Sequence, residues 1–458
     1  MTQHTNKDKK LMGQTPLQSK DDEVVLVLHR GRLAKLLVQF PRVETFTVAR
    51  GWNQQVISAF QEAIHTVIQA NPILSGRLYQ DKGGILYVRY PKKPTTCNIK
   101  DDEFVTVQDL SDDDKTLANI RNVSEQELSK FLEAYIIPRF QTETPESTKV
   151  EISKGTHLFE ASLLILPDNH VCYRIGLSHA LGDAATYYLL VKQISCALQG
   201  KLENAPKIQW GTNPKLATHE LAPASYSKRN LWVAHGWPVV FGVIISAITT
   251  ASRRRNTVIL LSREKINKKK QELLNREKNS FLSSHDIILA ALCQSKPSIH
   301  LMSLNKDERE RDSTIHPHDG GNFITLHHFP RSYGEDPNNI RQMVNSTTTY
   351  YGDHKNIPVP LRSMLSGKFC VTSSWANQTN LIEGEGIVNL GHFPSPRFYS
   401  ATVLPHNVAV IFSMNENCIG VAHNFVEEKR RKNKNSIKQT LLDEILYDKD
   451  AVSEGNQR

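Results

Sequence analysis

The feature that most constrains the fold is an alternation of apolar strands and amphipathic helices on both sides of an irregular, proline-bearing stretch at residues 200–230. In the first half, Val171–Leu177 has the continuous apolar character of a buried strand. Residues 56–70 repeat apolar side chains every three or four positions, which is typical of an amphipathic helix. The second half repeats this alternation. Strands that alternate with helices indicate a mixed α/β fold in two domains.

The boundaries follow from the same alternation, and 458 residues suffice for two domains of roughly 200 residues each. We expect further strands at 24–29, 158–166, 258–261, 323–329, 408–414 and 418–422, a hairpin of 76–79 with 85–88 around Gly83-Gly84, and helices at 124–134 (with a capping signal at Ser124), 184–199, 264–274, 284–293 and 437–447. The predicted organisation is a flexible lead-in at 1–22, a first domain at 23–200, a crossover at 201–256, a second domain at 257–447 and a polar tail at 448–458.

Composition excludes several classes of protein. With 39% hydrophobic and 22% charged residues, the chain is neither a polytopic membrane protein nor a disordered scaffold. The net charge of +9 is too dilute to indicate nucleic-acid binding. The six cysteines stand far apart with no C-x-x-C pair, which favours buried thiols in a reducing compartment over disulfides or zinc. The N-terminus has no apolar run of the signal-peptide type, so a cytoplasmic location is expected.

The most apolar segment lies in the crossover, at residues 231–251. His235, Gly236 and Pro238 interrupt its first third, and the uninterrupted part after Pro238 is too short to cross a bilayer comfortably. Three interpretations stay open: a spanning helix, an interfacial segment in peripheral contact with a membrane, and a buried connector that lines a substrate channel. The third is favoured, and it suggests a lipophilic substrate.

His179 and Asp183 form an H-x-x-x-D pattern directly after the predicted strand 171–177. A histidine is well suited to accept a proton from an alcohol at neutral pH, and a nearby carboxylate can organise its surroundings. The sequence has no G-x-S-x-G elbow, H-E-x-x-H metal pair or P-loop, so the histidine would act directly on an acceptor, without a covalent intermediate. The spacing alone is common by chance, and a loop histidine beside a solvated aspartate is the alternative.

Other histidines are weaker candidates. The local set His316, His318 and Asp319 lacks a fourth ligand and sits in a polar loop, so we expect no metal site there. His327 and His328 fall within a predicted strand, where their rings point to opposite faces, so at most one is expected inside.

The segment 175–184 (IGLSHALGDA) resembles the catalytic segment of the BAHD acyltransferases, the plant and fungal branch of the chloramphenicol-acetyltransferase-like superfamily. Four further stretches resemble motifs of that family in the same order: 71–78 (NPILSGRL), 283–292 (SSHDIILAAL), 309–311 with 320–322 (RER and GGN), and 373–375 (SSW). The resemblance covers roughly residues 24–425, which is nearly the whole chain.

This resemblance implies two chloramphenicol-acetyltransferase-like domains, each a mixed β-sheet flanked by helices, with a channel between them. Acyl-CoA, a co-substrate and not a bound cofactor, would enter one end and the acceptor the other. His179 would take the acceptor proton as its oxygen or nitrogen attacks the thioester. Asp183 would support the loop through a salt bridge with Arg309, for which Arg311 is the near alternative. The Trp375 N–H and the Ser373 hydroxyl would lie near the oxyanion or the acceptor, although Trp375 could equally fill the core between the domains.

The implied activity is that of a CoA-dependent O-acyltransferase acting on a fairly hydrophobic alcohol, expected to be a monomer. An N-acyltransferase is one alternative. A wax-ester or diacylglycerol-type enzyme is another, although those carry a second histidine where this chain has Ser178. A non-catalytic or membrane-tethered relative is a third.

Of three departures from the family pattern, Ala184 and the eroded motif at residues 389–393 motivate the non-catalytic alternative. Ala184 replaces the glycine of H-x-x-x-D-G, and its methyl group is harmless only at a negative φ. The D-F-G-W-G motif aligns with Asn389–Phe393, which keeps only a glycine, and Cys293 stands where tryptophan is usual.

Overall fold

The computed structural model describes residues 23–29, 41–82, 85–93, 104–111, 117–140, 152, 155, 157–210, 256–277, 281–309, 315–346, 368–378, 381–399, 407–425 and 440–447. The predictions made for residues 1–22, Gly83-Gly84, 231–251, Arg311 and 448–458 lie outside these residues.

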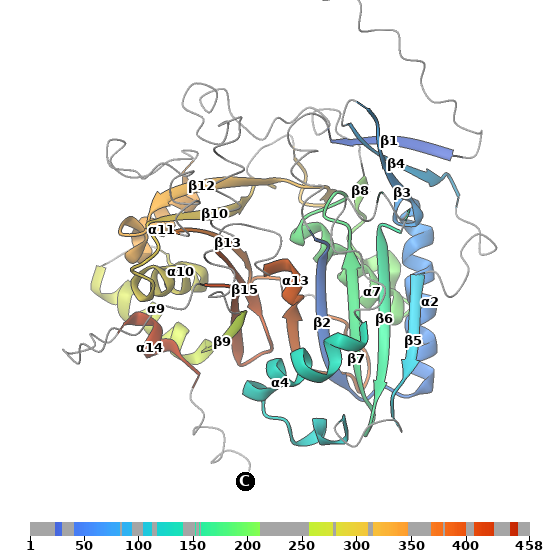
Figure 1. Cartoon of the computed structure of the whole chain (residues 1–458), viewed down its shortest axis with the longest axis horizontal. Helices are drawn as coiled ribbons and strands as arrows, with labels where there is room; N and C mark the ends of the chain where they lie inside the picture. The colour runs from blue at the N-terminus through green and yellow to red at the C-terminus, as the bar shows by residue number, and fades with distance from the viewer. Residues whose placement is uncertain are drawn as a thin grey trace, which may run out of the picture.

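The first sheet has five strands in the order β14-β2-β7-β6-β5 (Figure 1). Strands β2, β7 and β6 are antiparallel neighbours, and β5 runs parallel to β6. A tight turn joins β6 to β7, and Asp168 and Asn169 both adopt φ 57° there, as hairpin turns of the mirror-image type require. The bounds are β2 Val43–Arg50, β5 Val105–Asp109, β6 Phe159–Leu166, β7 His170–Leu177 and β14 Val388–Pro394.

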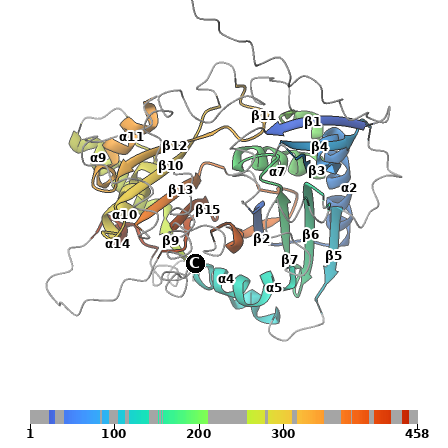
Figure 2. The ribbon, with the colours of Figure 1, turned by 45° about the horizontal axis from the view of Figure 1, so that its top comes forward.

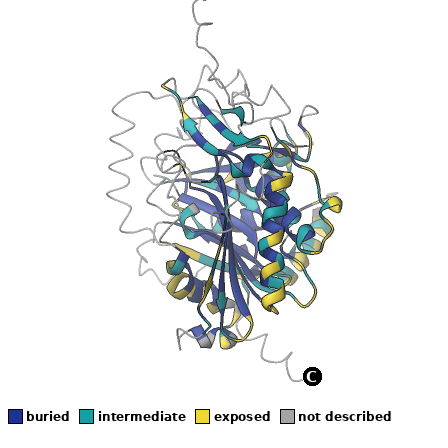
Figure 3. Cartoon of the chain, turned by 90° about the vertical axis from the view of Figure 1, so that its right-hand side faces the viewer, coloured by how far each residue is buried: buried dark blue, intermediate teal, exposed yellow. Residues whose placement is uncertain are grey.

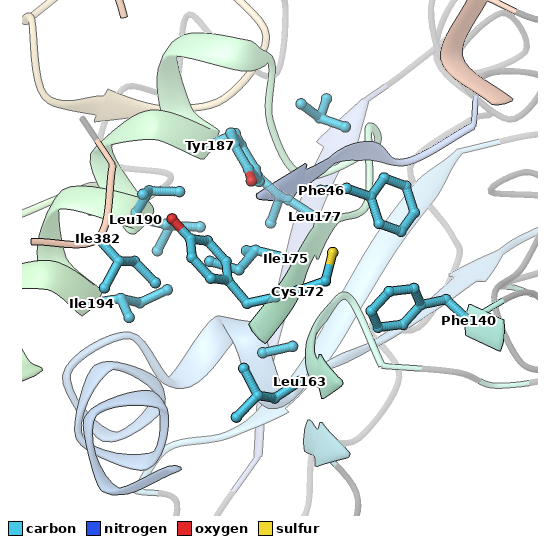
Figure 4. Packing of buried hydrophobic residues seen from close by; sticks show 14 of the residues in the cluster. Phe46, Phe140, Leu163, Cys172, Ile175, Leu177, Tyr187, Leu190, Ile194 and Ile382 are labelled. Carbon is cyan, nitrogen blue, oxygen red and sulfur yellow. The ribbon is translucent and has the colours of Figure 1, made fainter. Parts of the chain in front are cut away.

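Helices α2 (Gln54–Ala70) and α7 (Ala184–Leu198) cover one face of this sheet. Side chains of α7, Tyr187 among them, point toward β7 in Figure 4, and the Tyr187 hydroxyl bonds with Thr45. On the opposite face, Phe46 meets Phe140 with ring centroids 5.3 Å apart. Figure 3 shows the strands buried between these layers, whereas α2 exposes one side to solvent.

The second sheet has six strands in the order β12-β10-β13-β15-β16-β9. The bounds are β9 Thr257–Ser262, β10 Leu301–Asp307, β12 Ile324–Pro330, β13 Phe369–Trp375, β15 Asn407–Ser413 and β16 Cys418–His423. The helices that accompany it are α9 Arg263–Glu277, α10 Ser284–Ser295, α11 Pro337–Asn345 and α14 Leu441–Ile445. Ser283 and Asp286 form a reciprocal capping box at the start of α10.

The second sheet turns one face toward these helices and the other toward the first sheet. Along β15, Ala409 and Ile411 pack with the helices, whereas Val408, Val410 and Phe412 belong to the core of the first sheet. We call the latter side the inner face of the second sheet.

Strand β14 joins the two halves, because it lies between β13 and β15 of the second sheet in sequence but pairs with β2 of the first sheet. The ring of Phe393 on β14 lies 6.0 Å from that of Phe412. The two-domain α/β prediction is therefore confirmed, and β14, from the predicted second-domain range 257–447, contributes a strand to the first sheet. Sequence periodicity cannot reveal which sheet β14 joins, because a buried strand has the same apolar pattern in either sheet.

Smaller elements complete the fold. Strands β1 (Glu23–His29), β4 (Leu86–Pro91) and β3 (Arg77–Gln80) form a three-stranded sheet beside α2 (Figure 2). In the crossover, β8 (Gln209–Trp210) pairs in parallel with β11 (Asp319–Gly320). The short helical segments are Pro72–Ser75, Leu117–Asn122, α4 Glu125–Phe131, a π-turn Leu132–Ile136, α5 Ile137–Phe140, Leu202–Asn204, Tyr333–Glu335 and α13 Pro396–Tyr399.

Two local predictions need correction. The Ser124 side chain does not cap the backbone of α4 but donates to Glu127 Oε2 at 3.0 Å. His327 and His328 do point to opposite faces of β12, yet both are buried, since the helices cover one face and the other is the inner face. Among the described residues, we find no helix both long and apolar enough to cross a membrane.

Candidate active site

The loop that carries His179 is a tight turn between β7 and α7. Ser178 N donates to Leu158 O at 2.7 Å, and the amides of Leu181 and Gly182 donate back to Ser178 O. Gly182 is required here, because a Cβ atom would lie 2.7 Å from the Cβ of Thr186. The turn therefore holds the backbone of His179 at the end of the sheet.

Asp183 ends this turn and begins α7 as its N-cap, accepting a hydrogen bond from Thr186 N at 3.0 Å. Arg309, which follows β10 of the second sheet, binds both carboxylate oxygens: Nη1 to Oδ2 at 2.9 Å and Nη2 to Oδ1 at 3.0 Å. Both residues are less than a tenth exposed. The ion pair predicted between Asp183 and Arg309 is present, and its bidentate geometry joins the two domains four residues after His179.

A second contact between the domains comes from the segment after β11. Asn322 Nδ2 donates to His179 O at 2.8 Å, so the backbone of the candidate base is held from the second domain. Gly321 O accepts from Asp183 N at 3.1 Å, and Phe323 N donates to Asp183 Oδ2 at 2.9 Å. Residues 320–322, which resemble a family motif, thus belong to a segment that forms hydrogen bonds with the His179 loop.

The contacts of Arg309 and residues 321–323 with the His179 loop form what we call the His179 junction. Thr186, which was not predicted as a site residue, lies at its centre. Its Oγ1 accepts from Arg309 Nη2 at 2.8 Å and from Gly321 N at 3.1 Å, and it donates to Gly321 O at 2.9 Å. A hydroxyl has one proton and two lone pairs, so these three bonds satisfy it completely. Only its position three residues after Asp183 could have indicated this role.

The junction is supported from behind by the crossover. The Trp210 ring packs against Gly320, where a Cβ atom would lie 2.6 Å from the ring. Trp210 Nε1 donates to Asn71 Oδ1 at 2.9 Å, and Asn71 Nδ2 donates to Gln193 Oε1 at 2.7 Å. Trp210, in the part of the crossover expected to be irregular, therefore connects the first domain to the β11 segment.

The electrostatic setting favours a neutral histidine beside a charged aspartate. Burial lowers the pKa of His179 below its ordinary value, and the opposing influence of Asp183 and Asn322 does not cancel this. Burial also opposes ionisation of Asp183, but the charge and hydrogen bonds of Arg309 outweigh it and hold that pKa below its usual range. A neutral imidazole is the form that can accept a proton.

Ser373 and Trp375 lie at the end of β13, with their side chains on the inner face of the second sheet. Trp375 Nε1 donates to Ser373 Oγ at 3.0 Å. Trp375 is 2% exposed, and its ring meets that of Tyr188 of α7 edge to face at 6.3 Å. Trp375 thus packs in the core between the domains, and the proximity of either residue to a reacting group stays a prediction.

The departures from the family pattern have structural explanations. Ala184 is the first residue of α7 and does not have a positive φ, so its methyl group causes no backbone strain. Residues 389–393 belong to β14, where His392 shares hydrogen bonds with Thr47 at 2.7 Å and Tyr188 at 2.8 Å. These bonds fix this segment to β2 and α7 of the first domain.

The candidate metal ligands have structural partners instead. Asp319 Oδ2 accepts from His316 N at 2.9 Å, and Asp319 O accepts from Arg309 Nε at 3.1 Å. Within the described part of the chain, no cluster of three or more histidine, cysteine or acidic side chains could hold a metal ion.

No family model matches the sequence, and no curated protein matches it either. Its structure is similar to vinorine synthase (13% identity, 90% of this chain and 92% of the other, TM-score 0.53). It is also similar to the first condensation domain of the calcium-dependent antibiotic synthetase (11%, 86% and 88%, TM-score 0.52). A third similar structure is F. graminearum TRI101 complexed with coenzyme A and T-2 mycotoxin (14%, 88% and 95%, TM-score 0.50). At these identities the likeness establishes the fold alone, which is the two-domain chloramphenicol-acetyltransferase-like fold.

Proposed function

We propose that the protein is an acyl-CoA-dependent acyltransferase that acylates a hydroxyl group, with His179 as the general base. The observation that carries this proposal is the buried His179 loop, held from the second domain by Arg309 on Asp183 and by Asn322 on His179 O. A loop held from both domains fixes the backbone from which the imidazole projects, and base catalysis between two substrates needs such a fixed position.

In this reaction, neutral His179 takes the proton of the acceptor hydroxyl as its oxygen attacks the thioester carbonyl. The tetrahedral oxyanion then collapses, the carbon–sulfur bond breaks, and the imidazolium returns the proton to the CoA thiolate. The products are the ester and free CoA. General-base assistance of this kind accelerates reactions by about 10² to 10⁴-fold.

The geometry at the end of β13 favours the Ser373 hydroxyl over Trp375 as the oxyanion donor. Since Trp375 Nε1 already donates to Ser373 Oγ, the hydroxyl keeps its own proton for another acceptor. The Trp375 bond would orient Ser373 and strengthen it as a donor.

The comparisons and the sequence guide the choice of substrates. TRI101 has been crystallised with coenzyme A and T-2 mycotoxin, which supports a CoA co-substrate and a small-molecule acceptor for this chain. The hydrophobic character proposed for the acceptor rests on the apolar segment 231–251 of the sequence.

Release of free thiol by the purified protein tests the proposal, with a panel of acyl-CoAs and lipophilic alcohols and with His179→Ala in parallel. His300→Ala is the matched control, because His300 is an exposed histidine of the second domain. We expect acceptor-dependent release that persists in His300→Ala and disappears in His179→Ala. If the wild type binds CoA but releases no thiol with any acceptor, the protein is a binding module and the proposal fails.

A further inference from the structure

A row of polar side chains crosses the inner face of the second sheet, away from the His179 loop. Ser303 and Asn305 lie on β10, and His328 lies on β12 directly opposite Ser303. Ser303 and His328 are both 0% exposed. We call these three residues the polar strip.

The pairing of the strands places the strip on the side that faces the first domain. Ser303 is in register with Val371 of β13, and Val371 with Val408 of β15, which packs in the core of the first sheet. The alternate residues Met302 and Leu304 pack instead with the helices on the other face. The strip is therefore on the same face as Ser373 and Trp375.

Strand β10 connects the strip to the candidate active site. Asp307 shares the face of Ser303 and Asn305 because side chains alternate along a strand, and its Oδ1 accepts from Arg309 Nη1 at 3.0 Å. Ser303 lies four residues from Asp307, or about 13 Å along an extended strand. One end of β10 thus reaches the His179 junction, and the strip begins two residues back along the same strand, at Asn305, and continues to Ser303.

Two atoms of the strip are buried without a hydrogen-bond partner within the described residues: Ser303 Oγ and Asn305 Oδ1. Besides His328 opposite Ser303 and Asp307 further along β10, their inner-face neighbours include Leu301, Leu326 and Phe369, which are apolar. A buried polar atom without a partner is costly, and most such atoms in folded proteins are paired. Two of them together on the face shared with Ser373 indicate a place where a ligand supplies the partner.

We propose that the polar strip binds a neutral hydrogen-bonding group, such as a hydroxyl, at the far end of the acceptor. This inference rests on the proposed acyltransferase function and narrows its substrate class to elongated, mostly apolar acceptors with a distal polar group. A ligand hydroxyl matches the two atoms, since it can donate to Asn305 Oδ1 and accept from Ser303 Oγ.

The surroundings argue against a charged occupant. Burial lowers the pKa of His328 to about 4, so its ring is neutral and offers no charge to a carboxylate or phosphate. The nearest cation in the sequence of β10, Lys306, points to the opposite face and donates to Ser346 O at 2.8 Å. The phosphates of CoA would be poorly accommodated at such a buried, neutral end, which favours the acceptor as the ligand.

Equilibrium binding tests the strip independently of turnover. The probes are decanol and the matching diol with a hydroxyl at each end, titrated calorimetrically into the wild type, Ser303→Ala and Asn305→Ala. Ser413→Ala is the matched control, because Ser413 is a buried serine on the opposite face of the same sheet. We expect the wild type and the control to bind the diol about tenfold or more tightly than decanol, and each strip variant to lose most of this preference.

In each strip variant, the ratio of kcat/KM for the diol to that for decanol, at saturating acyl-CoA, should fall together with the binding preference. The Kd of CoA should stay constant. Equal binding of both probes by the wild type overturns the strip as a ligand site, whether or not thiol is released. If Ser303→Ala binds CoA more weakly but keeps the diol preference, the assignment of the polar strip to the acceptor is overturned. Selective diol binding without turnover would instead refute the acyltransferase proposal and leave the site standing.

Discussion

Replacing Arg309 with leucine should reduce both stability and catalysis, and the structure sets the size of each effect. The change removes both bonds from Arg309 to Asp183, together with those to Thr186 Oγ1 and Gly321 O. Asp183 keeps its bonds from Phe323 N and from Thr186, so its charge is not left wholly unsolvated. Removing one partner of a buried ion pair costs about 3–5 kcal/mol, and we expect the lower end of that range. A displacement of His179 by about 1 Å would lower kcat by about 100-fold.

The stability loss in Arg309→Leu should depend on pH in a defined direction. In the wild type, the folded pKa of Asp183 lies below the unfolded value of about 3.9, so this stabilisation is fully present above about pH 4 and is lost as pH falls through the folded pKa. In the variant, burial acts without Arg309 and raises the pKa of Asp183 above that of the unfolded chain. The variant then gains stability as Asp183 is protonated. The deficit relative to wild type is therefore largest near neutral pH and shrinks in mild acid.

Urea unfolding at several pH values measures the stability change, and thiol release measures turnover. Arg341→Leu is the matched control, because Arg341 pairs with the fully buried Asp286 at 2.5 Å in the second domain, outside the His179 junction. We expect it to lose stability while kcat changes less than about twofold. If Arg309→Leu loses stability as expected but keeps wild-type kcat, the ion pair does not position His179 and the argument from the junction is refuted.

Three further outcomes are expected. Asn322→Ala removes the bond to His179 O, so kcat should fall about tenfold with an unchanged CoA Kd, and an unchanged kcat would mean that this bond does not position the base. Because burial lowers the pKa of His179, the acidic limb of a kcat/KM profile should fall below about pH 6.5, the ordinary imidazole value, and a limb above that would contradict a buried base. Ala184→Gly should lower the free energy of unfolding by about 0.5–1 kcal/mol in urea and leave kcat unchanged, whereas a large gain in kcat would show that the alanine limits activity.

Local signals in the sequence predicted local features well. Ser283 and Asp286 have the spacing of a capping box, and the structure contains that box at the start of α10. Apolar side chains at helical spacing over residues 56–70 correspond to α2, which runs from Gln54 to Ala70. Both features depend only on residues within a few positions of one another.

The contacts that build the site depend instead on residues far apart in the chain. The Arg309 pairing with Asp183 was accessible only through the resemblance, because no local pattern selects one arginine among many. The bonds of Thr186 with Gly321 join positions separated by 135 residues, and nothing in either neighbourhood indicates them. Strand β10 was missed because only three of its seven residues are apolar, and two of the polar ones, Ser303 and Asn305, belong to the polar strip.

The exchange of β14 between the halves has a consequence for biosynthesis. Until β14 leaves the ribosome, β2 is an open sheet edge, a template for wrong pairing with other chains. The bond between Thr47 and His392 spans 345 positions, so this edge stays open while most of the second sheet is made. The first domain is therefore completed only after nearly the whole chain has been synthesised, which makes folding slow and dependent on protection of that edge. For the same reason, a fragment that stops before residue 388 should aggregate rather than yield an isolated first domain.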